Sequence, residues 1–455
     1  MSSSDTGLGP GLGTLCVIGL GYIGLPTAVA FAQAGWRVRG VDVSEERVAM
    51  VNDGRLPFVE DGLDRVLHEV VASGALAAST APIPAEVFVI SVPTPFADDH
   101  SVDMRSIFEA AASITPLLKG GELIILESTV PPGSTERMAR AILDARPDLA
   151  AGESAPDGEL MFAHAPERVL PGRIMAELAS NDRIVGGLTP RAALRAKEVY
   201  ESFSTGLVSA TDAPTAELAK LTENSFRDVN IAFANELSFI CEDLGIDVWE
   251  LIELANRHPR VDILQPGPGV GGHCIAVDPW FIVSSAPERA RLIRTAREVN
   301  DSKPRAVVTR VEELVSDLGI TGARIGVLGL AFKADIDDLR ESPAVDITRA
   351  LAEKDWVEEI LVVEPNITSL PSTLKSLGSI RLVDLEAALR ESEVLVLLVD
   401  HREFRALDRT LLEGRPVVDT KGLWRRNRGH SWGRESILSS WSCTARAQKA
   451  SKSPL

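Results

Sequence analysis

A cysteine at the end of a rigid loop is the first group in this chain that could do covalent chemistry. Residues 266–272, shortly before Cys274, comprise four glycines, two prolines and one valine. This composition excludes a helix or an interior strand and indicates a tight turn. A thiol presented there, with the carboxylate of Asp278 four residues further on, is typical of a nucleophile. The alternative is an ordinary loop around a buried structural cysteine.

A second chemical motif lies near the N-terminus. The apolar run 14–18 predicts a strand, and G-x-G-x-x-G follows it at residues 19–24. A predicted helix (25–34) and a second strand (37–41) lead to Asp42. In this order the glycines let the backbone approach a pyrophosphate at a helix N-terminus, and the acid binds ribose hydroxyls. We expect NAD rather than NADP, bound through Gly19, Gly21, Tyr22, Ile23, Gly24, Asp42 and Arg47.

Polar residues follow two further predicted strands, 87–92 and 122–127. They are Thr94, Ser128 and Thr129. Because ligands bind beyond the carboxyl ends of the strands in a doubly wound sheet, these residues are placed to line the nicotinamide half of a site. The plain alternative is turn chemistry alone. Another strand-end turn carries Glu167 beside Arg168.

A long helix is predicted to start after Thr211 or Asp212, either of which can cap it, and to end at Gly245. About 30 residues at 1.5 Å each give about 45 Å, enough to connect two domains. Lys220 and Asn224 are four residues apart and therefore share one face, where an amine and an amide could form a buried polar pair. The alternative is a solvated lysine on the flank of the helix.

A second alternation of strands and helices occupies the last third of the chain. Strands are predicted at residues 323–329, 360–363, 394–399 and 417–419. A charged loop separates the first of these strands from a helix that Pro343 opens. The loop carries Lys333 and Arg340, and a charged loop of this kind is often simply solvated.

Length and composition exclude several classes of protein. A chain of 455 residues is too long for one core, so two or three domains are expected. The formal net charge of −18 argues against a nucleic-acid partner, which would require a basic face. We expect neither a membrane span nor a signal peptide, because no suitable apolar run is present. The four scattered cysteines lack metal-ligand spacing and fit a reducing, cytoplasmic setting without a metal site.

These patterns predict an α/β protein with two Rossmann-like doubly wound domains joined by a long central helix. The expected divisions are a flexible tail (1–12), an NAD-binding domain (13–210), the central helix with the cysteine loop (211–315), a second Rossmann-like domain (316–428) and a disordered tail (429–455).

Taken together, the motifs resemble the UDP-glucose/GDP-mannose dehydrogenase family over about residues 14–425. The shared features are the glycine motif at 19–24, Ser-Thr-Val-Pro-Pro-Gly at 128–133, the Lys220/Asn224 helix with Asn235-Glu236, the Cys274 loop and residues 333–343. Residues 166–173 and 269–280 are most similar to the branch that acts on UDP-N-acetyl-D-mannosamine. Members that act on UDP-glucose usually carry Ser where His273 stands and Lys where Val277 stands.

The resemblance implies a four-electron oxidation, in which two NAD molecules convert the C6 hydroxyl of a UDP-sugar to a carboxylate for polysaccharide biosynthesis. It implies that Cys274 traps the aldehyde as a thiohemiacetal and then carries a thioester. Lys220 and Asn224 would stabilise the oxyanions, and the Lys220 ammonium would favour the Cys274 thiolate. Asp278 would orient a water or take the alcohol proton. Two residues are expected to position the hydrolytic water: Glu167 and Thr129.

The resemblance also assigns the second Rossmann-like domain to UDP and the long helix to a homodimer contact. Family members reach across the dimer with an arginine from before the cysteine loop, here Arg257 or Arg260. Beyond the glycine motif, the expected cofactor contacts are Thr94, Thr129 and Arg340. The expected substrate contacts are Glu167, Arg168, Lys220, Asn224, Arg257, Arg260, Gly271, His273 and Lys333.

Several alternatives stay open at this level. The sugar could instead be UDP-glucose or UDP-N-acetylglucosamine, and a catalytically silent NAD-binding protein is a further reading. Either Lys220 or a water bound to Asp278 could be the first base. His273 is expected to be structural or to contact substrate, because neighbouring side chains in an extended loop diverge from each other.

Overall fold

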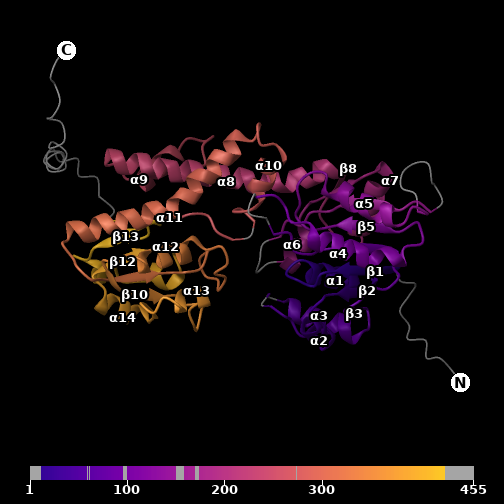
Figure 1. Cartoon of the computed structure of the whole chain (residues 1–455), viewed down its shortest axis with the longest axis horizontal. Helices are drawn as coiled ribbons and strands as arrows, with labels where there is room; N and C mark the ends of the chain where they lie inside the picture. Colours follow the sequence, from indigo (N-terminus) through magenta and orange to yellow (C-terminus); the bar gives the residue numbers. More distant parts are fainter. Residues whose placement is uncertain are drawn as a thin grey trace, which may run out of the picture.

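The computed structural model describes residues 12–58, 60, 62–95, 100–149, 158–169, 174–272 and 274–425. Two α/β domains lie at opposite ends of an elongated molecule, and two long helices run between them (Figure 1). The two expected tails lie outside the described residues, apart from Leu12.

The N-terminal domain is built on an eight-stranded sheet within the described residues. In spatial order its strands are β3 (Leu76–Ser79), β2 (Arg37–Val41), β1 (Thr14–Ile18), β4 (Val87–Ile90), β5 (Leu123–Leu126), β6 (Met161–His164), β7 (Arg183–Gly187) and β8 (Val208–Asp212). Neighbours are parallel except for β6 and β7. The strand order reverses beside β1, so the carboxyl ends of β1 and β4 flank the crevice in which this fold binds nucleotides.

Helices cover both faces of this sheet because its strands carry two apolar sets on alternating residues. Leu15 and Val17 of β1 pack in a core with α1, α3 and α7, whereas Cys16 and Ile18 pack with α4 and α5 on the other face. The helical segments are α1 (Gly24–Gln33), α2 (Glu45–Asn52), α3 (Leu63–Ala72), α4 (Arg105–Ile114), η1 (Thr115–Leu117), α5 (Ser134–Ala145), α6 (Ile174–Ser180) and α7 (Pro190–Glu201).

The central region contains α8 (Ala213–Leu244), α9 (Val248–Ala255), α10 (Asp278–Ser285) and α11 (Arg291–Asp317). Asp212 caps α8 by accepting a hydrogen bond from the Thr215 amide at 2.8 Å. The α8 helix ends at Gly245, whose φ of 67° suits glycine. The 32 residues of α8 span about 48 Å.

A buried polar cluster fixes α11 against α8. Arg297 on α11 contacts Asp228 on α8 at 2.7 Å, and the Asn300 side-chain amide donates to the same carboxylate at 2.8 Å. All three side chains are almost fully buried. Sliding one helix along the other would leave a buried charge unpaired, which is costly, so the cluster sets the register of the two helices.

The C-terminal domain has a five-stranded, fully parallel sheet in the described region. Its strands in spatial order are β11 (Ile380–Leu382), β10 (Val357–Val363), β9 (Ala323–Leu328), β12 (Val394–Leu397) and β13 (Val417–Asp419). Its helical segments are α12 (Pro343–Ala352), α13 (Ser372–Lys375), α14 (Leu385–Glu391), α15 (Arg402–Arg405) and η2 (Arg409–Leu412). The valines at 307, 308, 311 and 315 bring the second half of α11 into the core of this domain.

The predicted fold class is confirmed: two doubly wound α/β units flank a long central helix (Figure 1). The predicted strands match observed strands to within a few residues. The sequence reading missed α11, because Pro304 lies inside it and its charged first half carries no clear apolar stripe. It also missed β7 and β8, which extend the first sheet beyond a simple dinucleotide-binding unit.

Candidate active site

The backbone of the glycine motif is shaped to receive a dinucleotide. A Cβ at Gly24 would lie 1.9 Å from the Gly19 carbonyl oxygen, so only glycine lets α1 start this close to β1. A Cβ at Gly21 would meet no atom within 4 Å, so the turn faces open space. No side chain caps α1 at Ile23, which leaves N–H groups at the helix start for an anion. The residues present therefore fit a pyrophosphate.

Asp42 follows β2 at the carboxyl edge of the sheet. Its carboxylate accepts hydrogen bonds from the amides of Leu20, at 3.0 Å, and Ser44, at 2.9 Å. Arg47 folds back through the first turn of α2 and contacts the same carboxylate at 2.9 Å. These hydrogen bonds outweigh burial and lower the pKa of Asp42. An anionic carboxylate is therefore held where ribose hydroxyls would donate, with one cation directly beside it.

Arg340 connects the second domain to this nucleotide crevice. Its guanidinium lies 5.5 Å from the ring centroid of Tyr22, and Tyr22 stacks on Phe58 at 4.3 Å. Asp338 holds Arg340 in a two-point contact at 2.7 and 2.9 Å. The predicted cofactor residues Tyr22 and Arg340, which are distant in sequence, therefore lie together in the fold.

Cys274 lies one turn before α10, beside the first half of α8. The Asp278 amide donates to the Cys274 carbonyl at 2.8 Å, which places Asp278 at the start of α10. The Asn224 side-chain amide donates a hydrogen bond to Asp278 Oδ2. Val277 and Phe281 pack on Leu221, which holds α10 against α8. We expected Asn224 to pair with Lys220 on the same helix face, but its hydrogen-bond partner is Asp278.

Burial raises the pKa of both acidic groups of this centre, Asp278 and Cys274. Burial raises the pKa of Asp278 to about 6, while Lys220 and the Asn224 hydrogen bond oppose the rise. The Cys274 side chain is solvent-exposed, but protein surrounds its thiol closely enough that desolvation raises the thiol pKa. The charge of Asp278 raises it further, and Lys220 and Arg340 only partly compensate. Lys220 thus favours the Cys274 thiolate, as expected, but desolvation and the charge of Asp278 outweigh it.

The cysteine loop is fixed from both sides by close packing. A Cβ at Gly271 would lie 2.4 Å from the Glu341 carbonyl oxygen and 2.9 Å from Cβ of Phe332, so the loop requires glycine where it meets the second domain. On the other side, Asn235 of α8 accepts a hydrogen bond from the Gly267 amide at 2.9 Å. The loop thus lies between α8 and the second domain. His273 lies outside the described residues.

The strand-end residues of the first domain form a compact group. The Thr94 hydroxyl donates to the Thr129 carbonyl at 2.8 Å, and Ser128 binds both backbone groups of Val92. Glu217 of α8 hydrogen-bonds to the neighbouring turn. This residue was not predicted from the sequence. Its buried carboxylate accepts hydrogen bonds from the amides of Gly133 and Thr135, at 2.6 and 2.7 Å. A carboxylate three residues before Lys220, among small and apolar neighbours, was the available signal.

Glu167 and Arg168 have different surroundings. Glu167 is buried and contacts Arg183 at 2.8 Å, and burial together with the Glu167 charge raises the pKa of nearby Glu127 to about 7. In the described part of the chain, no contact joins Glu167 to the Cys274 centre. Arg168 reaches α8, where its guanidinium contacts Glu223.

Three other predicted residues are exposed. Arg257 lies 3.9 Å from Glu253, and Arg260 lies in the segment after α9. Lys333 is exposed in the loop before α12. Within the described ranges, none of the three contacts the cysteine centre. No cluster of His, Cys, Asp and Glu that could hold a metal was found there, and no described helix has the length and apolar character to cross a membrane.

Two Rossmann-like domains flank a centre that holds a thiol, a carboxylate, an amide and an amine. This arrangement is typical of a dehydrogenase that can form a covalent intermediate with its substrate. Comparison with known proteins gives the family. Its three domain descriptions match in order: NAD binding domain (13–204), central domain (214–302) and UDP binding domain (326–426). The chain belongs to the UDP-glucose/GDP-mannose dehydrogenase family, whose members are NAD-dependent nucleotide-sugar dehydrogenases.

Individual relatives cover nearly the whole chain. A UDP-N-acetyl-D-mannosamine dehydrogenase of Yersinia pestis is 55% identical over 423 residues, covering 90% of this chain and 99% of the relative. An NDP-N-acetyl-D-galactosaminuronic acid dehydrogenase of Ralstonia nicotianae is 52% identical over 416 residues, covering 91% and 97%. The solved UDP-D-ManNAc dehydrogenase of Pyrococcus horikoshii is 37% identical with a TM-score of 0.81, covering 91% of this chain and 96% of that one.

Proposed function

We propose that this enzyme oxidises the C6 hydroxyl of UDP-N-acetyl-D-mannosamine to a carboxylate through covalent intermediates on Cys274. The observation that carries the proposal is the grouping of Cys274, Asp278 and Asn224, with the charge of Lys220 acting on the first two. A simple alcohol oxidation needs no thiol, whereas oxidation to the acid needs a group that retains the aldehyde.

NAD, bound through the glycine motif and Asp42, would accept one hydride in each of two successive oxidations. The chain's own groups manage protons and charge. Asp278 is mostly ionised above its pKa of about 6, so it can take up the alcohol proton directly or through a water. Lys220 is the alternative base, because its charge acts on both Cys274 and Asp278.

The covalent chemistry takes place in successive steps on the sulfur of Cys274. The sulfur bonds to the aldehyde carbon, the thiol proton passes to a base, and the oxyanion is protonated to give a thiohemiacetal. Loss of a hydride and a proton converts it to a thioester, and water then cleaves the C–S bond to give the acid and the free thiol. Because the Cys274 pKa is raised in the resting chain, attack requires a base, and Asp278 is the described carboxylate whose charge acts on it. Lys220 would balance the oxyanion.

Glu167 and Thr129 remain part of this proposal as groups that position the hydrolytic water. Thr129 lies at the carboxyl edge of the sheet, with its backbone held by Thr94. Glu167 is anchored by Arg183 on one carboxylate oxygen. A fixed carboxylate of this kind can orient a polar neighbour such as a water.

The choice of sugar rests on the loop around Cys274 and on the relatives. The N-acetylmannosamine branch is favoured by residues 269–280, and a relative of that name shares 55% identity. A second candidate is the corresponding N-acetylgalactosamine nucleotide, which the 52% identical Ralstonia relative favours. UDP-glucose and UDP-N-acetylglucosamine are the remaining alternatives.

A panel of nucleotide sugars tests the proposal. Purified protein, NAD and each of four UDP-sugars (N-acetylmannosamine, N-acetylgalactosamine, N-acetylglucosamine and glucose) are mixed, and NADH is followed by absorbance. We expect the highest kcat/KM with UDP-N-acetylmannosamine and two NADH per sugar. A higher kcat/KM with another sugar would replace the substrate assignment, and no NADH with any of them would remove the catalytic proposal.

We also propose a homodimer through α8. Exposed apolar side chains recur along this helix at Phe226, Phe233, Ile240 and Leu244, and Phe226 is 71% exposed. The first three are seven residues apart, so they form one stripe, and such a stripe on a soluble surface is typical of an interface. In a dimer of this kind Arg257 or Arg260 of one subunit would be available to the other.

The remaining divisions of the chain belong to the same proposal. Residues 13–210 would hold NAD, 211–315 the catalytic helix and loop, and 316–428 UDP, with Lys333 as a phosphate contact. Cys16 and Cys241 are free and buried. A mechanism that needs a free Cys274 thiol suits a reducing compartment such as the cytoplasm.

A further inference from the structure

The two sheets of this enzyme share one backbone arrangement at their carboxyl edges. In the first, the Gly19 amide donates to the Val41 carbonyl, and the next amide, that of Leu20, donates to Asp42. In the second, the Gly329 amide donates to the Val363 carbonyl, and the next amide donates to Glu364 at 2.7 Å. Glu364 is therefore the structural counterpart of the ribose-binding acid Asp42.

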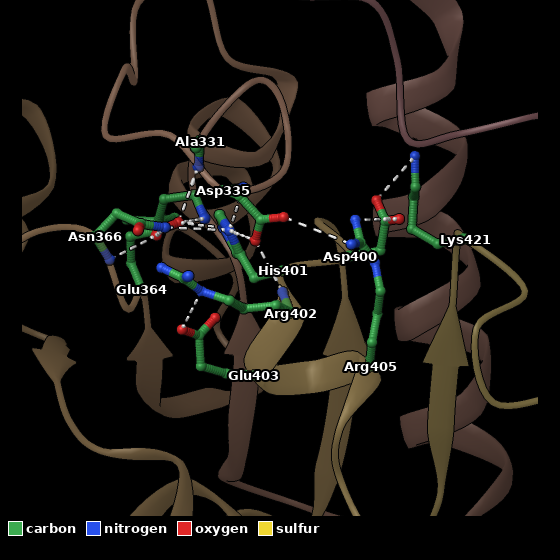
Figure 2. A network of polar contacts seen from close by, with 11 residues as sticks. Ala331, Asp335, Glu364, Asn366, Asp400, His401, Arg402, Glu403, Arg405 and Lys421 are labelled. Carbon is green, nitrogen blue, oxygen red and sulfur yellow. Dashed lines mark hydrogen bonds and ion pairs between the residues drawn. The ribbon is translucent and has the colours of Figure 1, made fainter. Parts of the chain in front are cut away.

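Both oxygens of the Glu364 carboxylate are hydrogen-bonded within the protein. Its side chain is buried, and one oxygen accepts from the Leu330 and Ala331 amides, at 2.7 and 3.1 Å. The other oxygen accepts from the Asn366 amide and side chain, both at 3.1 Å. Nε2 of the His401 ring lies 3.0 Å from the first of these oxygens, the one that the Leu330 and Ala331 amides bind (Figure 2). A carboxylate with this many donors has no capacity for a ribose, so it serves another purpose.

A long loop replaces the short glycine turn at this position. In the first domain α1 starts five residues after Gly19, whereas α12 starts fourteen residues after Gly329. We call residues 330–341 the bridging loop. Phe332 in this loop packs on Gly271 and Gly272 of the cysteine loop. Near the end of the loop, Arg340 reaches Tyr22 of the first domain. Its positive charge also lowers the pKa of the Cys274 thiol.

His401 fastens the middle of the bridging loop. Its ring is fully buried, and Nδ1 accepts a hydrogen bond from the Asp335 amide at 2.9 Å. Because Nδ1 accepts a backbone donor, the ring proton resides on Nε2 and points at Glu364. The Asp335 carboxylate in turn accepts from the Arg402 amide at 2.8 Å (Figure 2). The ring therefore joins the base of the loop, through Glu364, to its midpoint.

The backbone of the loop needs such a clamp. Asp335 has a φ of 63° and Glu341 a φ of 49°, left-handed values that residues other than glycine rarely adopt. Residues in this state persist where surrounding contacts over-determine them, and they concentrate at functional sites. The His401 and Arg402 contacts meet at Asp335, one of these two positions.

We propose that His401, supported by Glu364, is a positioning residue that holds the bridging loop so that Arg340 and Lys333 face the cofactor and the substrate phosphates. The counterpart of the ribose acid has thus been converted from a ligand-binding group into a loop anchor. The assignment of Lys333 and Arg340 rests on the proposed function, whereas the clamp itself rests on the contacts at Asp335 and Glu364.

Two substitutions separate the two bonds of the ring. In His401→Asn the side-chain oxygen lies where Nδ1 was and can still accept from the Asp335 amide. In His401→Gln the amide nitrogen lies where Nε2 was and still reaches Glu364, but the Asp335 amide loses its acceptor. We expect His401→Gln to raise KM for NAD and for the UDP-sugar about tenfold, with a smaller change in kcat, and His401→Asn to change KM less.

A destabilised core in the same domain provides the matched control. Leu374 is fully buried on α13, outside the bridging loop and the cysteine loop, so Leu374→Ala should lower Tm and leave both KM values unchanged. If the His401 variants behave like Leu374→Ala, with lower Tm and unchanged KM, His401 is merely structural and the proposal is overturned.

Hydrogen exchange on the wild-type enzyme tests the clamp without relying on activity or on a folded variant. The Asp335 amide belongs to an exposed residue, yet we expect it to exchange as slowly as amides of the adjoining sheet. Exchange at the rate of an unprotected amide would overturn the proposal. Titration with UDP and with NAD measures the two dissociation constants separately. An enzyme that oxidises no UDP-sugar would therefore refute the proposed function while the clamp is still tested.

Discussion

The side-chain amide of Asn224 donates a hydrogen bond to Asp278, which joins the long helix α8 to the first turn of α10 after the cysteine loop. The two residues are 54 positions apart in the chain. Both lie beside Cys274, and Asn224 is one turn from Lys220. This contact, together with the packing of Val277 and Phe281 on Leu221, joins the helix that carries the amine to the loop that carries the thiol.

Replacing Cys274 should separate binding from acid formation. In Cys274→Ser the alkoxide is harder to form than a thiolate and an ester leaves more slowly than a thioester, so we expect acid production to fall by about 10³-fold or more. Binding of the UDP-sugar, measured by calorimetry, should change little. Free aldehyde should not accumulate with the wild type. Acid production at the wild-type rate by the variant would return Cys274 to a structural role.

Asp278 should make the enzyme less stable as pH rises. Its pKa is 3.8 in the unfolded chain and about 6 in the folded one, so the folded state binds more protons between these values. Stability is therefore greatest below pH 4 for this group and is lost as pH rises through about 6. The loss is on the order of 3 kcal/mol. Asp278→Asn removes this dependence, so its Tm relative to wild type should rise between pH 5 and pH 8.

Asp278→Asn should also abolish one limb of the pH–activity profile. If Asp278 accepts the alcohol proton, wild-type kcat/KM should increase through about pH 6, and Asp278→Asn should lose about 10²-fold or more in activity together with that limb. A variant that kept both the limb and the rate would assign the base to Lys220. Equal pH dependence of Tm in the two proteins would contradict the burial argument for Asp278.

Asp42 and Arg47 should together control the choice between NAD and NADP. A 2′-phosphate would meet the Asp42 carboxylate in a partly desolvated site, at a cost of about 1–3 kcal/mol, or about 5- to 150-fold in affinity. Asp42→Asn should narrow the preference for NAD, since it also frees Arg47 from its contact with Asp42 to meet the phosphate. Asp42→Asn combined with Arg47→Ala is the control and should gain less with NADP. Equal kcat/KM with both cofactors in the wild type would refute the role of Asp42.

The apolar stripe on α8 should hold two subunits together. Phe233 is 52% exposed at the middle of the stripe, and Phe233→Asp would place a charge inside the proposed contact. Light scattering after gel filtration should give twice the chain mass of 48.8 kDa for the wild type and the single chain mass for the variant. Glu236→Gln, a polar change on the same helix, is the control. A monomeric wild-type protein would contradict the proposed dimer.

Local rules were sufficient for much of this protein. The glycine motif, the acid after the second strand and the ends of α8 could be predicted because each depends on neighbouring residues. Gly24 is required because a Cβ there would lie 1.9 Å from the Gly19 carbonyl oxygen, Asp212 caps the start of α8, and Gly245 takes up a positive φ. The composition of the Cys274 loop likewise indicated a rigid turn, because glycine and proline act on their own backbone.

Other predictions needed the path of the chain in three dimensions. The sequence placed Asn224 with Lys220 because they are four residues apart on one helix, but the packing of α10 on α8 brought Asp278 to Asn224. The sequence also indicated that Lys220 favours the Cys274 thiolate, but only the packing showed that desolvation and the charge of Asp278 outweigh Lys220. Burial and long-range charge depend on which elements pack together, and spacing within one helix does not report that.

The bridging loop shows the division most clearly. The sequence alone identified it as a charged loop that holds Lys333 and Arg340 between a strand and Pro343. Only the tertiary structure showed that His401, 66 residues after Asp335, binds its midpoint. A loop has no periodicity of its own, so its conformation is set by the partners that satisfy its backbone, and those partners come from strands that are adjacent in the sheet but distant in the chain.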